Sequence, residues 1–489
     1  MAWRLARTAS LANVLWLPVW ERVLYSRAWG VRSSEAPVAS LVGVIALALL
    51  LWTLEAVLGR LGRRGEVVWT LLVALALLAP LNVVRRAALP LDMGGGPWPW
   101  EAKALVLAGA GALAVWAVVR HTERVHRVLG GVLVACLPFA AVTVGQALVL
   151  ALPAPAQHPN GVVVPSPADL RRTVVLLFDE LDHDLAFDRR SPDVNLEEFD
   201  RLAARSFRAT QMRAAAGRTL EAVPAMLTGR AVEAAFLDSR NRLWVRWRGE
   251  EEFHDVAAAR TVFLNGSRAG ARVAVVGTWL PYCDLVPPGS RCWQVPALND
   301  GGAGWDGPRP EDRTRLSEAV GRQFLYALRA LPVFGQVVRE DPQAWYLRLL
   351  DAARQAVTDP ASELVWIHLP LPHPPWIFDR AQQRITYSAG GYDDNLVLAD
   401  RTLGAVRQAM ERAGLWEDSA VVVTSDHWYR EREAADLRVP LLVRFPDEAG
   451  WQHSAPADAT VLHGVVLAVL DGRVRSAQDL ARWIASTDS

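Results

Sequence analysis

Long runs of apolar residues fill the first 152 positions of the chain, and shorter apolar runs alternate with charged segments after them. The four longest runs approach the length of about 20 residues with which a helix crosses a bilayer. They cover residues 38–58, 67–84, 102–119 and 128–152. The pattern therefore predicts about four transmembrane helices in a membrane domain over residues 1–152.

The placement of arginine predicts how this membrane domain is oriented. The connections that follow the first and third predicted spans are rich in arginine, and basic loops prefer the cytoplasm. We therefore expect a multi-pass protein of the cell membrane, with everything after residue 152 on the extracytoplasmic side. A shorter apolar segment at residues 9–20 is expected to form an interfacial helix, and a fifth membrane crossing is the alternative.

The second part of the chain has the pattern of a globular α/β domain. Its short apolar runs lie at residues 173–178, 273–276, 364–367, 420–424 and 440–443. Helical patterns separate several of these runs, which predicts an α/β sandwich built on strands that are buried on both faces. We expect a proline-rich linker over residues 153–170 and the globular domain over residues 171–489. An amphipathic insertion at residues 313–358 is expected to pack on that domain, and contact with the membrane surface is the alternative.

Charge and cysteine content narrow the range of partners and compartments. The 52 basic and 52 acidic residues cancel, so we expect no nucleic-acid partner. Cys283 and Cys292 are separated by eight residues in a loop that contains proline and glycine. A disulfide between them and a pair of free thiols are both compatible with this spacing.

Residues able to carry chemistry follow the predicted strands. Asp179 and Glu180 end the first run, and Asp426 and His427 come directly after the run at 420–424. Because ligands bind at the carboxyl ends of strands in open α/β sheets, these side chains are candidates for one metal site. Thr219, just ahead of a helical stretch, is either a nucleophile or a helix cap. His368 and His373 lie in a proline-rich segment, where they would contact an anionic substrate or pack as loop histidines.

The order of these blocks resembles that of the sulfatase-like branch of the alkaline phosphatase superfamily. The blocks are FDELD, RTLEAVPAMLTGR, HLPLPHPPW and VVVTSDHW, and the resemblance covers roughly residues 170–475. The chain is similar in particular to lipoteichoic acid synthases and phosphoethanolamine transferases. This resemblance implies an alkaline-phosphatase-like fold that follows transmembrane helices. By this resemblance Thr219 is the catalytic nucleophile, and His373 and His368 bind the substrate. The implied ligands of one divalent metal ion are Asp179, Glu180, Thr219, Asp426 and His427.

The resemblance implies a membrane-anchored, metal-dependent hydrolase or transferase of phosphoesters that acts on lipid or cell-envelope polymer substrates. Mn²⁺ or Zn²⁺ is favoured, with Ca²⁺ or Mg²⁺ as alternatives. The place of Thr219 lacks the Cys/Ser-x-Pro-x-Arg motif of true sulfatases, which disfavours the alternative of a sulfuric ester hydrolase. Trp428 follows the Asp-His pair where many relatives have glycine, which leaves open a catalytically silent, anion-binding ectodomain. The head group of the substrate, the choice between hydrolase and transferase, and the oligomeric state are left open.

Overall fold

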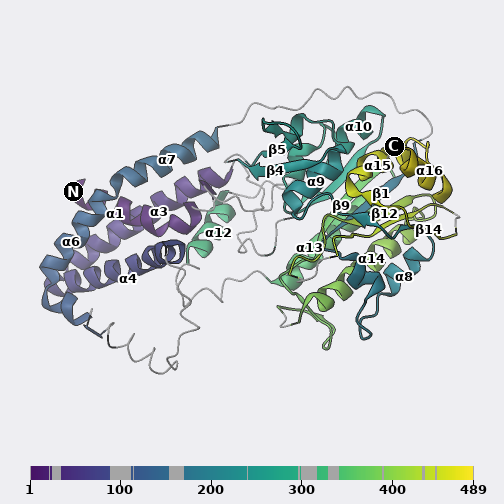
Figure 1. The fold of residues 1–489 in the computed structure, drawn as a ribbon. Coiled ribbons are helices and arrows are strands. Elements are labelled where there is room, and N and C mark those ends of the chain that lie inside the picture. The colour runs from purple at the N-terminus through teal and green to yellow at the C-terminus, as the bar shows by residue number, and fades with distance from the viewer. Residues whose placement is uncertain are drawn as a thin grey trace.

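The computed structural model describes two bodies of secondary structure, a bundle of helices and an α/β domain (Figure 1). The described residues are 2–20, 23–24, 35–88, 109, 112–113, 115–152, 170–238, 241–295, 298, 316–328, 341–387, 390–431, 436–446 and 449–487. The predicted linker, except residue 170, lies outside them, as does part of the predicted span at 102–119.

The bundle contains the first, second and fourth predicted apolar runs. Its helices are α1 (Ala2–Leu15), α2 (Leu17–Trp20), α3 (Glu35–Gly59), α4 (Gly62–Ala88), α6 (Thr122–Ala135) and α7 (Leu137–Ala151). The predicted first, second and fourth spans coincide with α3, with α4 and with the pair α6 and α7. Within the described residues, the stretches Ala36–Gly59 and Thr122–Ala151 are long and apolar enough to cross a membrane. Length and composition alone are weak evidence, so multi-pass topology stays a prediction.

The segment at residues 9–20, expected to form an interfacial helix, lies inside the bundle. Helix α1 contacts α3, α4, α6 and α7, and Leu11 and Trp16 are fully buried. The segment also makes polar contacts that its apolar pattern does not reveal. Asn13 Oδ1 accepts hydrogen bonds from Trp20 Nε1 and from Thr143 Oγ1, both at 2.9 Å. The segment thus packs with the other helices of the bundle, and its place at the interface or across the membrane stays a prediction.

An eight-stranded mixed sheet forms the centre of the α/β domain, in the order β14-β2-β13-β12-β1-β9-β7-β8. The bounds are β1 (Thr173–Asp179), β2 (Phe207–Ala209), β7 (Val273–Gly277), β8 (Arg291–Gln294), β9 (Leu364–Pro372), β12 (Ala420–Ser425), β13 (Leu441–Arg444) and β14 (Trp451–His453). All five predicted runs are strands. Every residue of β1, β9 and β12 is buried, as the uninterrupted apolar runs predicted. The run at 440–443 contributes β13, which is antiparallel to β12 and makes the sheet mixed.

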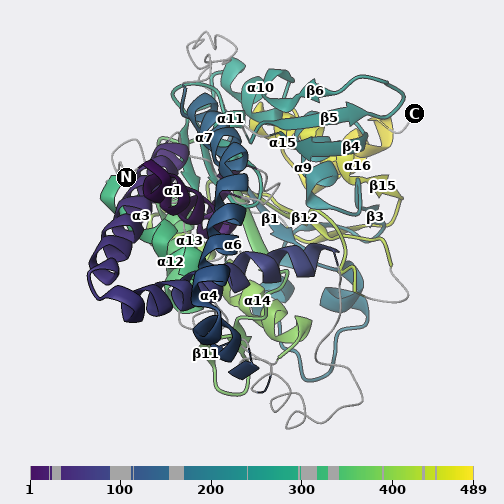
Figure 2. The same ribbon diagram turned by 90° about the vertical axis from the view of Figure 1, so that its left-hand side faces the viewer.

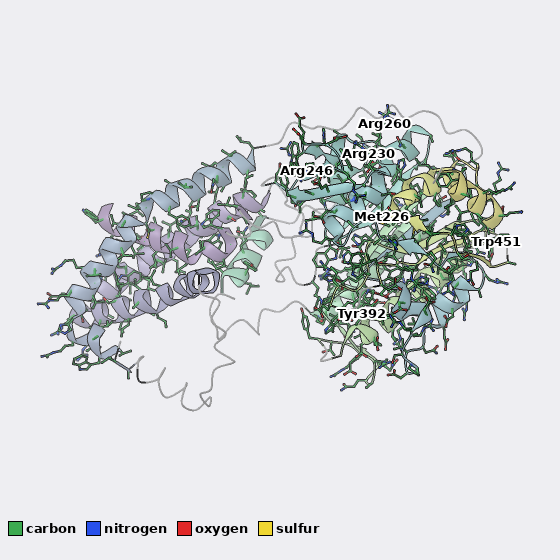
Figure 3. All side chains as sticks on the ribbon, in the orientation of Figure 1. Met226, Arg230, Arg246, Arg260, Tyr392 and Trp451 are labelled. Atoms are coloured by element: carbon green, nitrogen blue, oxygen red, sulfur yellow. A yellow bond between two sulfur atoms is a disulfide. The ribbon has the colours of Figure 1, made fainter. Side chains whose placement is uncertain are left out.

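Helices cover both faces of this sheet and enclose two hydrophobic cores (Figure 2). One core contains α9 (Thr219–Thr228), α10 (Val262–Arg268), α15 (Leu462–Leu470) and α16 (Ala477–Thr487). The other contains α8 (Glu197–Ala203), α13 (Pro342–Val357) and α14 (Tyr392–Arg412). Figure 3 labels Met226 in the first core and Tyr392 in the second. The predicted α/β sandwich is confirmed.

Smaller elements complete the described part of the domain. The short strands are β3 (Met212–Arg213), β4 (Val232–Leu237), β5 (Leu243–Trp247), β6 (His254–Asp255), β10 (Phe378–Asp379), β11 (Arg384–Ile385) and β15 (Ala457–Asp458). Helix α11 (Tyr282–Leu285) carries Cys283, which forms a disulfide with Cys292 in β8. Of the two states left open by the sequence, the structure contains the bridge.

The insertion at residues 313–358 divides between the two bodies. Helix α13 packs in the second core of the domain, as expected. Helix α12 (Leu316–Leu328) packs instead against α3 and α2 of the bundle (Figure 1). Gln323 is fully buried there, donates to the Ala36 carbonyl and accepts from Ser40 Oγ, both at 3.0 Å. The expectation was wrong for α12, because this glutamine finds partners on α3 and the Phe324 ring meets Trp16 edge-on.

Candidate active site

The carboxyl ends of β1 and β12 bring predicted site residues together. The two strands are parallel neighbours, with Phe178 opposite Ser425. Asp179 ends β1 and Asp426 follows β12, so both carboxylates leave the sheet at the same edge, where ligand sites of α/β folds lie. His427 comes next in the chain and its imidazole is fully buried.

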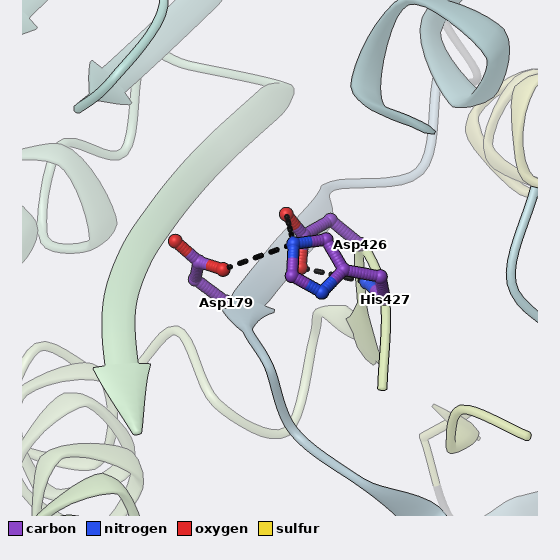
Figure 4. Close-up of side chains that lie close together, drawn as sticks. All are labelled: Asp179, Asp426 and His427. Carbon is purple, nitrogen blue, oxygen red and sulfur yellow. Dashed lines mark hydrogen bonds and ion pairs between the residues drawn. The ribbon is translucent and has the colours of Figure 1, made fainter. Parts of the chain in front are cut away.

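The His427 ring lies at the centre of this group. Its Nε2 is 3.6 Å from Asp179 Oδ1 and 3.4 Å from Asp426 Oδ2 (Figure 4). Thr219 Oγ1 lies 3.3 Å from the same nitrogen. Four predicted site residues thus meet at one point, and we refer to Asp179, Thr219, Asp426 and His427 as the inner cluster.

Backbone hydrogen bonds aim the side chains of the inner cluster. His427 Nδ1 lies 3.0 Å from the Trp428 carbonyl, which can only accept, so Nδ1 carries the proton and Nε2 presents a lone pair to the cluster. Asp426 Oδ1 accepts from the backbone N–H groups of His427 at 2.7 Å and of Glu180 at 3.2 Å. Its other oxygen, Oδ2, is left facing the imidazole.

Burial makes the two carboxylates electrostatically unequal. Asp179 is 1% exposed and Asp426 is fully buried. Burial raises the pKa of Asp179 well above its ordinary value, and the neighbouring charges of Asp426 and Glu180 raise it further. Burial acts on Asp426 in the same direction, but His427, His368 and the Thr219 hydroxyl hold the pKa of Asp426 below its ordinary value. The pair therefore favours one ionised carboxylate and disfavours the second.

The inner cluster fits a divalent metal ion. Asp179 Oδ1 and Asp426 Oδ2 are buried and have no hydrogen-bond partner among the described residues. Buried polar atoms are normally paired, and unpaired carboxylate oxygens beside an imidazole lone pair are what a cation requires. One ligand atom from each of Asp179, Asp426 and His427 lies within 4.8 Å of the others. Mixed oxygen and nitrogen donors suit Zn²⁺ or Mn²⁺.

The hydroxyl of Thr219 faces the other residues of the inner cluster and does not cap a helix. Helix α9 begins at Thr219, and its N-cap residue is Arg218, whose backbone is extended. Because the cap position belongs to Arg218, the Thr219 side chain is not needed to close the helix. Its partner is His427, and the residue is 7% exposed. This placement favours the nucleophile over the cap, the two roles that the sequence left open.

Glu180, a predicted metal ligand, turns toward the edge of the site. Its Oε1 accepts from Arg430 Nε at 2.9 Å, and Arg430 Nη2 lies 3.3 Å from His373 Nε2. We refer to Glu180, Arg430 and His373 as the rim row. Glu180 Oε2 is buried and has no hydrogen-bond partner among the described residues, so this oxygen is the one that a metal ion could still recruit.

The two predicted substrate histidines occupy different places. His373 is part of the rim row, and its ring lies 5.2 Å from that of Trp279. His368 is fully buried in β9, and its Nδ1 lies 3.0 Å from the Tyr282 hydroxyl. Burial lowers the pKa of His368 to about 4, against the opposite effect of Asp426. His368 is therefore neutral at physiological pH, whereas His373 is the histidine at the edge of the site.

Sequence reasoning missed Arg430 and left the place of Trp428 open. A Cβ atom on Gly217 would come within 3.0 Å of Trp428 Cη2, so the indole covers the backbone just ahead of Thr219. Trp428 is thus a wall of the site and leaves the inner cluster intact. Arg430 stands three residues after His427, and this closeness in the chain to the Asp-His pair is the signal that could have found it.

A family model matches part of the chain. Residues 320–464 match the Sulfatase family model. The resemblance to sulfatase-like enzymes that the sequence predicts is thereby confirmed for this part of the chain. The match includes Asp426 and His427, whereas Asp179 and Thr219 precede it. No curated protein sequence matches the chain.

Solved structures of sulfatase-like and related enzymes are similar to the chain at low identity. The phosphonate monoester hydrolase of Agrobacterium radiobacter is 16% identical, with a TM-score of 0.39, over 62% of this chain and 77% of its own. The lipoteichoic acid synthase LtaP from Listeria monocytogenes is 12% identical, with a TM-score of 0.40, over 64% and 76%. A protein of the alkaline phosphatase superfamily from Vibrio parahaemolyticus is 13% identical, with a TM-score of 0.41, over 64% and 70%. At these scores the site itself rests on the geometry of this chain.

Proposed function

We propose that the chain is a membrane-anchored, metal-dependent phosphoester hydrolase or transferase with Thr219 as its nucleophile. The observation that carries the proposal is the Thr219 hydroxyl, 3.3 Å from His427 Nε2 at the edge of two buried, unpaired carboxylate oxygens. A nucleophilic hydroxyl must lose its proton, and a cation bound at the inner cluster would favour that loss. The sulfatase-like match supports the same reaction class.

The inner cluster holds the metal in this proposal. Asp179, Asp426, His427 and Thr219 supply donor atoms, and Glu180 Oε2 is the reserve ligand. A bound divalent cation lowers the pKa of a coordinated hydroxyl and offsets the charge of a phosphoryl group. We favour Mn²⁺ or Zn²⁺ because carboxylate and imidazole ligands are mixed, with Ca²⁺ or Mg²⁺ as alternatives.

The reaction then proceeds by two displacements at phosphorus. In the first, Thr219 Oγ1 bonds to phosphorus, the bond to the leaving oxygen breaks, and the hydroxyl proton passes through solvent to the leaving oxygen. In the second, water or an acceptor hydroxyl or amine bonds to phosphorus and gives its proton to solvent. The bond from Thr219 Oγ1 to phosphorus breaks, and the Thr219 oxygen takes a proton from solvent. Water as the acceptor makes the enzyme a hydrolase, and an alcohol or amine makes it a transferase.

We propose a lipid or cell-envelope polymer as the substrate and an extracytoplasmic position for the α/β domain. The apolar bundle supports membrane anchoring, and α12, which lies between β8 and α13 in the chain, packs against that bundle. The Cys283–Cys292 disulfide supports an oxidising compartment, because cytosolic thiols are kept reduced. Nothing in the balanced charge of the chain favours a nucleic acid.

The test compares Thr219→Ala with Thr219→Ser in purified full-length protein supplied with Mn²⁺. The alanine variant is expected to lose turnover of a phosphodiester by on the order of 10⁴-fold or more, the scale on which enzymes lose rate without their nucleophile. The serine variant keeps the hydroxyl and is expected to retain measurable turnover. Both variants are expected to melt within a few degrees of the wild type, since neither removes a helix cap.

Two results would contradict the proposal. Undiminished turnover in Thr219→Ala would exclude Thr219 as the nucleophile. Wild-type protein that binds Mn²⁺ and phosphate but turns over no phosphodiester would favour the silent, anion-binding ectodomain.

A further inference from the structure

The rim row places a half-exposed guanidinium beside the inner cluster. The Arg430 side chain is 41% exposed, whereas that of its partner Glu180 is 3% exposed. Arg430 uses Nε toward Glu180 and Nη2 toward His373. No described residue lies within hydrogen-bond distance of its Nη1. The guanidinium is thus fixed on one edge and open to solvent on another.

Arg430 is held in place by contacts of Tyr429, the residue before it, and of Tyr392. Tyr429 stacks on Tyr392 with ring centroids 4.3 Å apart. The Tyr392 hydroxyl donates to the Glu180 carbonyl at 2.8 Å and accepts from the Asp182 N–H at 3.0 Å. The chain is therefore anchored on both sides of the pair that Arg430 and Glu180 form.

Glu180 has an unusual backbone conformation that serves this arrangement. Its φ is 64°, in the left-handed region that residues other than glycine rarely adopt. Such strain persists only where neighbouring contacts impose it, and it clusters at functional sites. The Tyr392 hydroxyl on its carbonyl and the Asp426 carboxylate on its N–H are those contacts. They turn the carboxylate of Glu180 toward Arg430.

His373 completes the row as a hydrogen-bond acceptor. Its Nδ1 lies 2.6 Å from the Pro374 carbonyl, so Nδ1 carries the proton and Nε2 accepts from the guanidinium. Burial lowers the pKa of His373, although Glu180 acts against this. A neutral His373 leaves Arg430 as the only permanent cation of the row.

We propose that Arg430 is a substrate-binding residue that contacts an anionic phosphoryl oxygen of the ester held at the inner cluster. Glu180 and His373 act as its positioning residues. The free edge of a guanidinium matches phosphoryl oxygens in shape and charge. This inference rests on the proposed function, because it needs a phosphoester at Thr219. It adds a cationic subsite three residues beyond the metal-binding pair and restricts substrates to those with an anionic oxygen on the rim side.

The experiment measures binding and turnover separately in the full-length protein loaded with Mn²⁺. Inorganic phosphate is titrated by calorimetry, and bis(p-nitrophenyl) phosphate is the turnover probe. Arg430→Ala is expected to weaken phosphate binding and to raise KM about 10- to 100-fold, the effect of losing a charged hydrogen bond. The value of kcat is expected to stay within a few-fold. Millimolar guanidinium is expected to restore part of the lost phosphate affinity. Arg430→Lys is expected to have a KM between those of the wild type and Arg430→Ala.

The matched control is Arg272→Ala. Arg272 also pairs with a glutamate, Glu363, through Nε at 3.2 Å, but it precedes β7 at the opposite end of the sheet. This variant is expected to bind phosphate and probe as the wild type does. Unchanged phosphate affinity and KM in Arg430→Ala would overturn the inference. So would a loss that appears in Mn²⁺ content and melting temperature without guanidinium rescue, since Arg430 would then act only on the fold.

Failure of the proposed function can be recognised separately. If the wild type binds phosphate in an Arg430-dependent way but turns over no diester, the subsite stands and the nucleophile assignment fails. If the wild type turns over the diester and Arg430→Ala does so with the same KM, the nucleophile assignment stands and the subsite fails. Wild-type protein that binds no phosphate overturns the Arg430 inference directly.

Discussion

Two polar clusters in this molecule differ in how their charges are matched. In the helical bundle, Arg7 donates to Glu55 at 2.7 Å and lies 3.0 Å from His126, which in turn meets Thr70 at 3.2 Å. Each of these side chains comes from a different helix, and the one carboxylate has a guanidinium beside it. The inner cluster of the α/β domain instead gathers two carboxylates around one imidazole, with two oxygens unpaired.

The contrast separates a cluster that joins helices from one whose donor atoms fit the metal ion of the proposed function. A buried charge is tolerated when it is paired, and removing its partner is costly. In the bundle cluster Arg7 is the counter-charge of Glu55, although Glu55 Oε2 has no hydrogen-bond partner among the described residues. The two carboxylates of the inner cluster share one imidazole, so a bound cation would supply the missing counter-charge. The same side-chain types therefore serve stability in one body and chemistry in the other.

The largest expected difference between the two clusters is in metal affinity, and the removal of His427 tests it. His427→Ala deletes the only nitrogen donor of the inner cluster and is expected to lower the affinity for Mn²⁺ or Zn²⁺ by at least 100-fold, more than changes beyond the ligands usually do. Metal analysis after dialysis measures it. His126→Ala is the matched change in the bundle cluster, and it should leave metal content untouched. Equal metal loss in both variants would erase the distinction.

The bundle cluster should respond as a structural ion pair. Glu55→Leu leaves Arg7 without its carboxylate and is expected to destabilise the bundle by about 3 kcal/mol. The double change Arg7→Leu with Glu55→Leu is expected to recover much of this loss, because no unpaired charge remains. Thermal unfolding of full-length protein in detergent tests both. A double variant no more stable than the single one would count against the pairing.

Asp400 provides an intermediate case inside the α/β domain. It is 6% exposed and accepts from the N–H groups of Glu198 and Phe199 at 3.0 and 2.8 Å. Burial raises its pKa from 3.8 to about 6, against the effect of these two hydrogen bonds. Because the folded state holds the proton more tightly, Asp400 lowers stability progressively as pH rises from about 4 to 6.

The predicted consequence is a pH-dependent gain in Asp400→Asn. The asparagine keeps an oxygen for the two N–H groups and does not ionise. The stability of the variant relative to wild type is expected to rise by up to about 3 kcal/mol between pH 4 and pH 7. Unfolding measured at both pH values tests the sign, and a difference that is constant with pH would show that Asp400 does not titrate in this range.

The fold was largely predictable because β1, β9 and β12 are buried on both faces and therefore stand out as uninterrupted apolar runs. The inner cluster was predictable for the same reason, since its acids and histidine follow two of those strands directly. What escaped prediction depends on tertiary partners. The turn of Glu180 toward Arg430 rests on a left-handed backbone held by Tyr392, and the docking of α12 rests on Gln323 meeting Ser40 far away in the chain. No local pattern encodes such pairs.

The most direct test of the central claim is the covalent state of Thr219. Full-length protein with Mn²⁺ is mixed with bis(p-nitrophenyl) phosphate and quenched in acid during turnover, and intact and peptide masses are recorded. The account predicts a nitrophenyl-phosphoryl adduct on the peptide that contains Thr219, absent from Thr219→Ala and from wild type without metal. Turnover with no adduct at any time, or an adduct on another residue, would contradict it.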